Sequence, residues 1–494
     1  MKLTLPSQRT DFVRSIVGAT CLFVITLLTA SGCKTAGPDY QAPAADYPNA
    51  WSTGRQAGVT WVGTNTDTAI CWWTVFNDPI LTGLVARAQA GNLDVRQAVA
   101  RVRAARAERE IAQADRLPTL DANASASRTR SSGKTGPGGT SRQYANSLDA
   151  SWELDLFGGK RRTVEAADAT WQASQEDLHD VQVSLCAEVA LGYVDVRAYQ
   201  MRLSIAESNL ASQSETYDIT RWRLQAQLVT QLDVDQARLS LEQTRASLPS
   251  LRTGLEQSKH RLATLLGLPP GALLTLLGER RAIPVTPREI AVGVPAEVLR
   301  QRPDVRRAER QLAAQTAKIG VAAANRYPKV TLTGSIGLES MAAGDLYTLA
   351  ARTFSGAAAA GWTLFDGGRI DQTVTEQEAL RDESLGAYEA AILAALQDVE
   401  DTLVAYGDEQ DRRRALADAE QAARSAAALA RDRYASGLID FQTVLSTQQS
   451  LLSVQDSLAA SEAQATSDLV RLYKALGGGW TPLPPVNSDL NGSR

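Results

Sequence analysis

The side chains that most often bind metals or carry out redox chemistry are few in this chain and lie far apart. Its 494 residues include two histidines and four cysteines, which are His179, His260, Cys21, Cys33, Cys71 and Cys186. None of them has the spacing of a zinc, haem or iron–sulfur site. The sequence also lacks a Walker loop, a Gly-x-Gly-x-x-Gly run and a Gly-x-Ser-x-Gly nucleophile motif. We therefore expect no metal, no cofactor and no catalytic residue, and an enzyme is the least favoured class of function.

The net charge bears on which partners the chain can bind, and the cysteines bear on whether it contains a disulfide. Lysine and arginine number 51 and aspartate and glutamate 55, a formal charge of −4 that argues against a nucleic acid bound by bulk charge. In an oxidising compartment Cys71 and Cys186 could form a disulfide, although sequence alone does not place them close together. Within a helical stretch, Cys186 is better explained as a small buried residue.

The first 32 residues have the features of an export signal. A basic start containing Lys2 and Arg9 precedes an apolar stretch from Ile16 to Ala30, too short for a good membrane span but typical of a cleaved signal peptide. Small residues lead up to Cys33, which indicates a lipobox and a lipidated new N-terminus; ordinary cleavage nearby is the alternative. No later apolar run is long enough for a transmembrane helix, so strands must make any membrane crossing.

The remainder of the chain repeats itself at a nearly constant spacing. Five features recur after 209 or 210 residues: Asp94-Val95-Arg96, Pro118, Trp152, Gly158-Gly159 and Leu266-Gly267 return as Asp304-Val305-Arg306, Pro328, Trp362, Gly367-Gly368 and Leu476-Gly477. One offset across so many landmarks indicates an internal duplication. The predicted organisation is a signal peptide (1–32), a lipidated extended segment (33–71), a first repeat (72–267) with a β-hairpin at 118–157, a Pro-rich connector (268–296), a second repeat (297–477) with a β-hairpin at 328–366, and a tail (478–494).

Each repeat is predicted to run as a helix, two strands and two very long helices. Pro79 and Pro303 suit the first turn of a helix, and Pro118 and Pro328 are expected to end those helices. Apolar and polar residues then alternate, as in Leu120 to Ser125, which is typical of strands. The long helices carry seven-residue apolar repeats, which predict left-handed coiled coils with uninterrupted runs of about 55 residues, roughly 80 Å each. The fold class is mainly α with membrane β.

Four amphipathic strands suit a surface with lipid on one side and water on the other. Four strands cannot close a barrel, and an open sheet edge is not tolerated in lipid, so we expect several chains to share one barrel. Three chains would supply about twelve strands, within the range of outer-membrane barrels. The alternative from the pattern alone is a soluble helical rod with two hairpins.

In order along the chain, five motifs make the sequence similar to the TolC-like outer-membrane efflux channels, in their NodT/OprM-like lipoprotein branch. They are Gly37-Pro38-Asp39-Tyr40, Trp72-Trp73 with Phe76-Asn77-Asp78-Pro79, Arg302-Pro303-Asp304-Val305, Leu364-Phe365-Asp366-Gly367-Gly368, and the segment from Tyr473 to Trp480. The resemblance covers almost the whole mature chain. It implies a homotrimer in the outer membrane of a Gram-negative bacterium, with a twelve-stranded β-barrel continuous with a periplasmic α-barrel. It also implies a periplasmic adaptor, an inner-membrane RND pump and the passive export of drugs, metals or other small toxic molecules.

The resemblance places adaptor docking at the turns between the paired long helices, around 221–233 and 433–444. Leu228, Val229, Thr230, Gly437 and Leu438 are the expected docking residues. Gly437 would supply the left-handed conformation of a sharp reversal, whereas the first repeat has Gln227 at that position. A plain coiled-coil reversal explains Gly437 equally well.

Relatives often carry a ring of aspartates just inside these tips, and this chain has Gln442, Thr443 and Ser446 at the matching positions. Asp440 could replace the ring by focusing a negative potential in the pore, or it could cap the helix that follows. We favour the cap, and therefore expect a pore constriction that is polar and weakly charged.

Three functions compete at this point. The first is an export duct for a proton-driven pump, favoured by the lipobox and by the motif around Arg302. The second is the outer-membrane duct of a type I protein secretion system. The third is a periplasmic coiled-coil scaffold, which would be extracted without detergent and would form no heat-modifiable trimer.

Overall fold

The computed structural model describes residues 35–43, 48, 50–52, 60–62, 71–135, 138–286, 289–291 and 295–480. The expected signal peptide, the lipidation site Cys33 and the segment after Trp480 lie outside these residues. The chain divides into two compact units. We call them the sheet unit (Met1–Pro43, Ala104–Gln172, Arg310–Gly386) and the hairpin unit (Ala44–Arg103, Ala173–Glu309, Ala387–Arg494).

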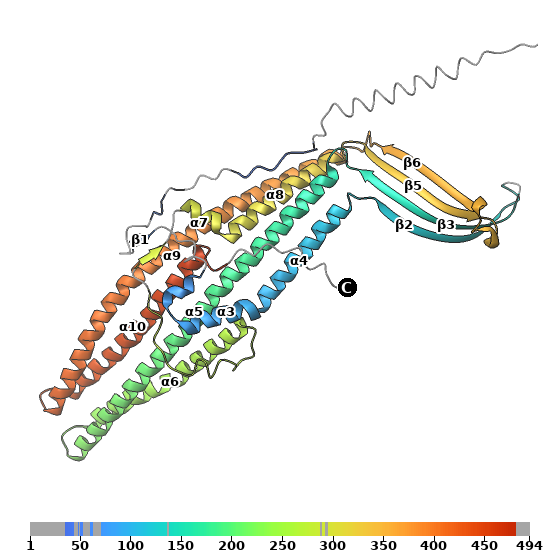
Figure 1. Ribbon diagram of the computed structural model, residues 1–494. Helices are drawn as coiled ribbons and strands as arrows, with labels where there is room; N and C mark the ends of the chain where they lie inside the picture. Colours follow the sequence, from blue (N-terminus) through green and yellow to red (C-terminus); the bar gives the residue numbers. More distant parts are fainter. Residues whose placement is uncertain are drawn as a thin grey trace, which may run out of the picture. The chain divides into compact units, whose positions relative to one another are not determined.

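Both repeats have the same order of elements (Figure 1). The first contains α3 (Pro79–Gly91), α4 (Leu93–Ala114), β2 (Thr119–Ser131), β3 (Gly139–Leu154), α5 (Gly159–Gln225) and α6 (Gln231–Leu265). The second contains α7 (Pro295–Gln301), α8 (Pro303–Ala324), β5 (Lys329–Ser340), β6 (Arg352–Gly361), α9 (Arg369–Ala435) and α10 (Phe441–Ala475). Short elements complete the described chain: β1 (Thr60–Val62), which pairs in parallel with β4 (Glu289–Ala291), and the 3-10 turns η1 (Trp72–Phe76), η2 (Ala343–Asp345) and η3 (Leu349–Ala351).

The predicted strands and long helices are confirmed, with three corrections. The single helix expected between Pro79 and Pro118 is two helices, α3 and α4, and the second repeat likewise has α7 and α8 before its strands. The paired helices are unequal, because α5 and α9 have 67 residues each and α6 and α10 have 35 each. Neither length equals the expected run of about 55 residues, whereas both reversals lie within the expected ranges 221–233 and 433–444. The helices α4 and α8 end at Ala114 and Ala324, so Pro118 and Pro328 do not end them but directly precede the strands β2 and β5.

The four long strands form one antiparallel sheet in the order β2-β3-β5-β6 within the sheet unit. Each repeat contributes a hairpin, and β3 pairs with β5 where the two repeats meet. In the register, Ala122 faces Leu148, and Leu148 faces Ile336. Strands β2 and β6 therefore form the two edges of the described sheet, and each has one side without a partner strand.

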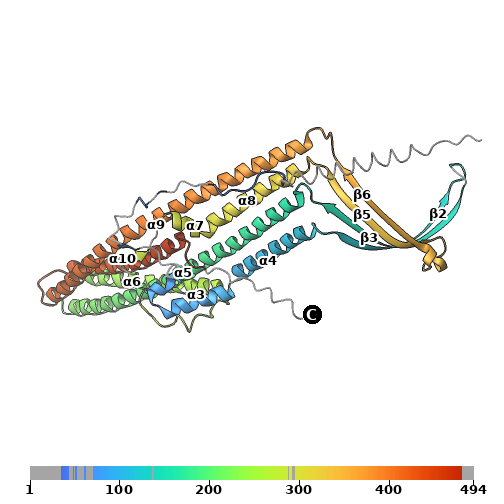
Figure 2. The same ribbon diagram turned by 45° about the horizontal axis from the view of Figure 1, so that its top comes forward.

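The core of the hairpin unit lies between its helices, and α5 with α6 and α9 with α10 form two helical hairpins that lie side by side in both views (Figures 1 and 2). The predicted heptad positions on α6 are all buried: Val234, Leu241, Leu248, Leu255 and Leu262 line one stripe. Trp72 is fully buried and stacks on Tyr473 at 5.5 Å between ring centroids. A heptad stripe buries apolar surface continuously, which is how helices of this length are stabilised.

Candidate functional site

The two helical hairpins end in turns with the same backbone geometry. In the first turn the amide of Leu228 donates to the carbonyl of Arg223, and in the second the amide of Leu438 donates to the carbonyl of Arg433, both at 2.9 Å. Such a bond closes the C-terminus of a helix when the residue just before the donor has a left-handed backbone. Gly437 has φ of 74° there, as the sequence predicted. Gln227 has φ of 57°, so the first turn takes the same conformation without a glycine and bears the steric cost of a side chain.

The docking residues expected from the sequence lie at these turns. Leu228 and Leu438, at equivalent positions of the two repeats, are 72% and 73% exposed. Val229 is half-buried behind the first turn. Thr230 caps α6, and its amide donates to the Asp233 carboxylate at 2.8 Å in a capping box. The turns therefore present two apolar side chains on rigid, capped ends.

The expected pore residues lie on the first turns of α10. Asp440 caps this helix: it accepts from the Thr443 amide at 2.8 Å and from the Thr443 hydroxyl at 2.6 Å. These bonds from the Thr443 hydroxyl and amide hold the pKa of Asp440 below its ordinary value of 3.8. Gln442, Thr443 and Ser446 are exposed. The capping role that the sequence favoured for Asp440 is what its geometry displays.

Arg223 links the two hairpins near their ends, and sequence analysis did not single it out. One terminal nitrogen of its guanidinium donates to the carbonyls of Tyr434 and Ala435, both at 3.0 Å. These carbonyls lie at the end of α9, where the helix dipole is negative, and the Tyr434 carbonyl also accepts from the Gly437 amide at 3.0 Å. The guanidinium carbon also lies 4.3 Å from the centroid of the Tyr434 ring, a cation–π distance. Arg223 is therefore an inter-hairpin latch.

Beneath the latch, a small apolar cluster has buried residues from three of the four hairpin helices, and Tyr217 of the fourth, α5, packs against it. It consists of buried residues from α6, α9 and α10, namely Ala237, Ala430, Tyr434, Phe441, Val444 and Leu445. The Tyr434 and Phe441 rings lie 5.7 Å apart. The position that corresponds to Arg223 in the second repeat is Arg433, 210 residues later, and no ion pair or hydrogen bond of its side chain is found among the described residues.

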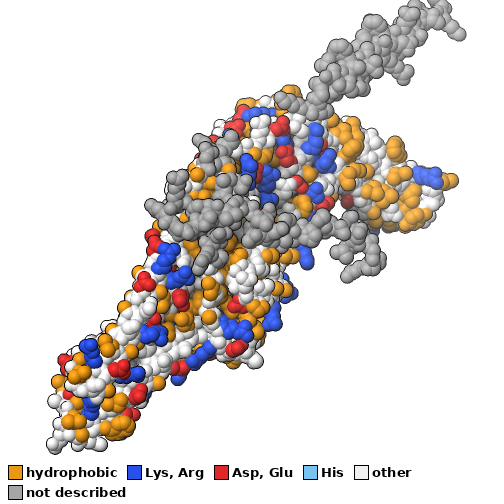
Figure 3. All heavy atoms as spheres, turned by 60° about the vertical axis from the view of Figure 1, so that its left-hand side comes forward, with side chains coloured by type: hydrophobic (Ala, Val, Ile, Leu, Met, Phe, Trp, Pro, Cys, Tyr) orange, Lys and Arg blue, Asp and Glu red, His pale blue; other side chains and the backbone are white. Residues whose placement is uncertain are grey.

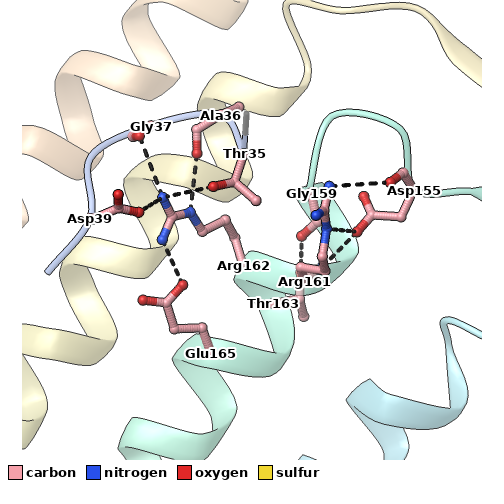
Figure 4. Close-up of polar contacts among 10 residues, drawn as sticks. All are labelled: Thr35, Ala36, Gly37, Asp39, Asp155, Gly159, Arg161, Arg162, Thr163 and Glu165. Atoms are coloured by element: carbon pink, nitrogen blue, oxygen red, sulfur yellow. Dashed lines mark hydrogen bonds and ion pairs between the residues drawn. The ribbon is translucent and has the colours of Figure 1, made fainter. Parts of the chain in front are cut away.

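In the sheet unit, a second arginine holds the segment that follows Cys33 (Figure 4). Arg162, whose side chain is only 4% exposed, donates to the carbonyl of Ala36 at 3.1 Å and to the Asp39 carboxylate at 2.6 Å. Its other terminal nitrogen bonds Glu165 at 2.7 Å. Burial opposes the charge on Arg162, but the bonds to Glu165 and Asp39 prevail and raise its pKa. We call this set, with residues 35–39, the N-terminal clamp.

Glycines make room for the N-terminal clamp. A Cβ on Gly37 would lie 2.4 Å from the Cα of Gly320 on α8, and one on Gly158 would lie 2.6 Å from the side chain of Thr35. Gly37 and Gly158 also have φ of 81° and 83°. The Gly-Pro-Asp-Tyr motif that sequence analysis used only as a family marker is therefore a segment bound in a slot beside the start of α5.

The sheet has one apolar and one polar face, because strand residues alternate between faces. Even-numbered positions such as Leu120, Leu148, Leu332 and Ile336 share the apolar face through the observed register. Odd-numbered positions carry the polar side chains: Asn123 donates to Asp149 at 2.7 Å. Figure 3 shows hydrophobic side chains gathered on the sheet, with basic side chains at its loop end.

The remaining candidates have structural surroundings. Cys71 is exposed and Cys186 is buried, and both are free thiols; burial raises the pKa of Cys186 to about 12. His179 stacks on Trp480 with ring centroids 4.2 Å apart, and His260 is exposed. Within the described residues, no three His, Cys, Asp or Glu side chains gather as a metal site requires. None of the described helices carries an apolar stretch long enough to cross a membrane.

Comparison with known proteins gives the family. The model of the family described as "Outer membrane efflux protein" matches residues 84–268 and again residues 294–478, once in each repeat. The chain belongs to this family. Nodulation protein T of Rhizobium leguminosarum bv. trifolii is 34% identical over 466 residues, covering 92% of this chain and 96% of the relative. The solvent efflux pump outer membrane protein SrpC of Pseudomonas putida is 34% identical over 473 residues, covering 93% of this chain and 98% of the relative.

Solved structures agree with the family. The outer-membrane channel OprN superposes with a TM-score of 0.86 at 37% identity, over 91% of this chain and 100% of that one. The open-state MtrE outer membrane channel of Neisseria gonorrhoeae superposes with a TM-score of 0.80 at 28% identity, over 90% of this chain and 98% of that one. The chain is thus an outer-membrane efflux channel of a Gram-negative bacterium with the duplicated, mainly helical TolC-like fold that the sequence predicted.

Proposed function

We propose that three copies of this chain form one channel, in which a shared twelve-stranded barrel crosses the outer membrane and the long helices continue it into the periplasm. The observation that carries the proposal is the four-stranded sheet, which has one apolar face and two edge strands, β2 and β6, without outer partners among the described residues. Backbone groups exposed at such edges cannot be left unsatisfied in lipid. Pairing β6 of one copy with β2 of the next removes every edge.

The duplication gives the register of this pairing. At the junction between the repeats, Leu148 of β3 faces Ile336 of β5. The repeat offset of 210 residues takes these positions to Ala358 of β6 and Ala126 of β2. The same offset converts the observed β2–β3 register into the observed β5–β6 register, for example Thr119 facing Ser151 into Lys329 facing Gly361. We therefore propose that Ala358 of one copy lies opposite Ala126 of the next, which keeps the apolar face continuous.

Cysteine cross-linking tests this register. Facing residues of antiparallel strands have Cα atoms about 4.5–5.5 Å apart, within the range that a disulfide spans. In a chain with Cys71→Ser, the pair Ala126→Cys and Ala358→Cys should oxidise to a covalent ladder that ends at a trimer. The control pair Ala126→Cys and Ala357→Cys places the second thiol on the other face and should cross-link far less. A stable monomer in the aqueous fraction, or equal cross-linking of both pairs, would contradict the proposal.

We also propose that Cys33 is lipidated. The N-terminal clamp supports this, because it binds a segment that begins two residues after Cys33 and lies beside the junction of β3 and α5. Two residues span at most about 7 Å, so the acyl chains would enter the bilayer close to the level at which the strands do. Metabolic labelling with palmitate, compared between the natural chain and Cys33→Ala, tests the assignment.

At the tips, we propose that Leu228, Val229, Thr230, Gly437 and Leu438 contact the periplasmic adaptor of a tripartite RND-type system. Exposed leucines at both turns support this, since paired apolar side chains on rigid ends suit a protein partner. Gly437→Trp should then abolish efflux while trimers still assemble. Efflux at the natural level in this variant would contradict docking at this turn.

The constriction is proposed to lie at Gln442, Thr443 and Ser446, with Asp440 acting as a helix cap. If Asp440 only caps the helix, its charge does not act on ions in the pore. In planar bilayers, Asp440→Asn should therefore leave ion selectivity unchanged, since Asn still caps the helix. Strong cation selectivity that this substitution removes would instead assign Asp440 to the pore.

We propose that the cargo consists of drugs, metals or other small toxic molecules. Support comes from relatives named for antibiotic, solvent and toluene efflux. These names favour a pump-linked duct over a type I protein secretion duct. A deletion strain screened against antibiotics, metals and aromatic compounds should become sensitive to the cargo, and loss of a secreted protein without any new sensitivity would favour the secretion duct.

A further inference from the structure

Arginines and carboxylates on the four strands segregate completely by face. Arginines occupy only even-numbered positions of the apolar face: Arg128, Arg130, Arg142 and Arg352. Carboxylates occupy only odd-numbered positions of the polar face: Asp121, Asp149, Glu153 and Glu339. The polar face also carries Lys329, the first residue of β5. A sheet whose polar face lines water explains these groups, whereas the arginines on the opposite face require another explanation.

All four arginines lie at the loop end of the strands, away from the helices. Arg128 and Arg142 are directly opposite each other, and Arg130 follows on the same strand. On β3 the apolar face runs from Leu154 to Tyr144, ten residues or about 34 Å along the strand. At the tilt of barrel strands, about 40°, this corresponds to roughly 26 Å, the height of the apolar band of an outer-membrane barrel. Arg142 is the next residue on this face, so the arginines begin where the band ends.

Within the described residues these arginines have no counter-charge. Their side chains are exposed, and none of them forms an ion pair there. Two like charges directly opposite each other on a sheet are unfavourable unless an anion lies between them. Glu339 does not provide this anion, because it lies on the polar face and accepts a hydrogen bond from Gln143 at 2.7 Å. An anion that neutralises these arginines therefore has to come from outside the described residues.

We propose that Arg128, Arg130 and Arg142 form a binding site for the phosphate-bearing headgroup of a glycolipid in the outer leaflet. The proposal rests on the proposed function, which puts the helices in the periplasm and the strand loops outside. A ligand for this place needs acyl chains for the apolar face and an anionic head for the arginines, a combination that only a lipid provides. Guanidinium groups suit phosphate because they donate two parallel hydrogen bonds. Arg352 begins β6, whose edge meets β2 of the next copy in the proposed barrel.

The test uses the purified full-length trimer in detergent and fluorescent lipopolysaccharide as the probe. The variant Arg128→Gln/Arg130→Gln/Arg142→Gln should bind the probe at least about tenfold more weakly, since each lost charge-assisted contact is worth a sizeable part of a tenfold change. Binding to the natural chain should weaken as salt rises. The matched control is Arg412→Gln/Arg414→Gln/Arg424→Gln, which removes three exposed arginines of α9 and should bind as the natural chain does.

Two results would overturn the proposal: equal binding by the strand variant and the control, or competition by phosphatidylglycerol as effective as by unlabelled lipopolysaccharide. Two other measurements test the proposed function separately. If it is wrong, the cross-link between Ala126→Cys and Ala358→Cys and the heat-stable trimers will be absent from the same samples. If the triple variant does not assemble, Arg142→Gln alone is assayed, and it should weaken binding about threefold or more. Unchanged binding by an assembled Arg142→Gln trimer would then count against the site.

Discussion

The inter-hairpin latch gives the sharpest prediction about how the helix tips are held together. Substituting Arg223→Met keeps the aliphatic part of the side chain and removes the guanidinium. The lost contacts are two hydrogen bonds of 3.0 Å to the carbonyls of Tyr434 and Ala435, and a cation–π contact of 4.3 Å with Tyr434. The first hairpin should therefore separate more readily from the second at this end.

The magnitude follows from the geometry. One donor nitrogen shares two acceptors at a partly exposed site, so the pair is assigned about 1.5 kcal/mol, the low end for a single charged hydrogen bond. The cation–π contact adds about 0.5 kcal/mol at such a site. Together, about 2 kcal/mol corresponds to a change of about 30-fold in the equilibrium between joined and separated tips.

Hydrogen exchange measures this equilibrium at the backbone amides in the last turns of α9. Exchange there should accelerate about 30-fold in Arg223→Met. The control is Arg221→Met on the same helix, since Arg221 only reaches Asp218 at 3.8 Å within α5. If both variants exchange at the same rate, or if Arg223→Met exchanges as the natural chain does, the latch does not hold the tips.

Three further predictions concern the turns, the clamp and the cap. Gly437→Gln should lower the free energy of unfolding of the hairpins by about 1 kcal/mol. The cause is backbone strain alone, because no atom lies within 4 Å of the added Cβ. Gln227→Gly should not lower this free energy, and calorimetry compares the two variants. Arg162→Met should free residues 35–39 and speed proteolysis there at least tenfold, while Lys160→Met, which removes a 3.5 Å surface pair, should not. Because the pKa of Asp440 is lowered, its cap should be fully present above pH 3.8 and be lost only as the pH falls through the lowered pKa. Amide exchange in the first turn of α10 should show this loss. The substitution Asp440→Asn should remove the pH dependence.

Local pattern was enough to predict the repeat and the order of its strands and long helices, and the family resemblance added the reversal at Gly437. A spacing of 210 residues is visible directly, and a glycine at a helix reversal supplies the left-handed backbone that the turn needs. The lengths of the paired helices were missed because a heptad repeat shows which face of a helix is buried and not the residues at which the helix begins and ends. The role of Gln227 was missed because its side chain type gives no sign of a left-handed backbone.

The latch and the clamp could not be predicted because they join distant residues. Arg223 is 211 residues from Tyr434, and Arg162 is 123 from Asp39. An arginine at the end of a helix usually indicates only a favourable contact with its own helix dipole. The fact that Arg223 and Arg433 occupy equivalent positions was the one available signal, and the neighbour that each would meet depends on the tertiary fold.

The composition of β6 bears on how a newly exported chain survives before it meets its sisters. This edge strand reads Arg-Thr-Phe-Ser-Gly followed by four alanines and a glycine, and its alanines and glycines form strands poorly. A weak edge is slow to recruit the wrong neighbour, which limits aggregation in transit, but it also gains little from pairing until β2 of the right copy is aligned. Biogenesis of this channel should therefore be limited by the final seam and be unusually dependent on the factors that escort unfolded strands across the periplasm.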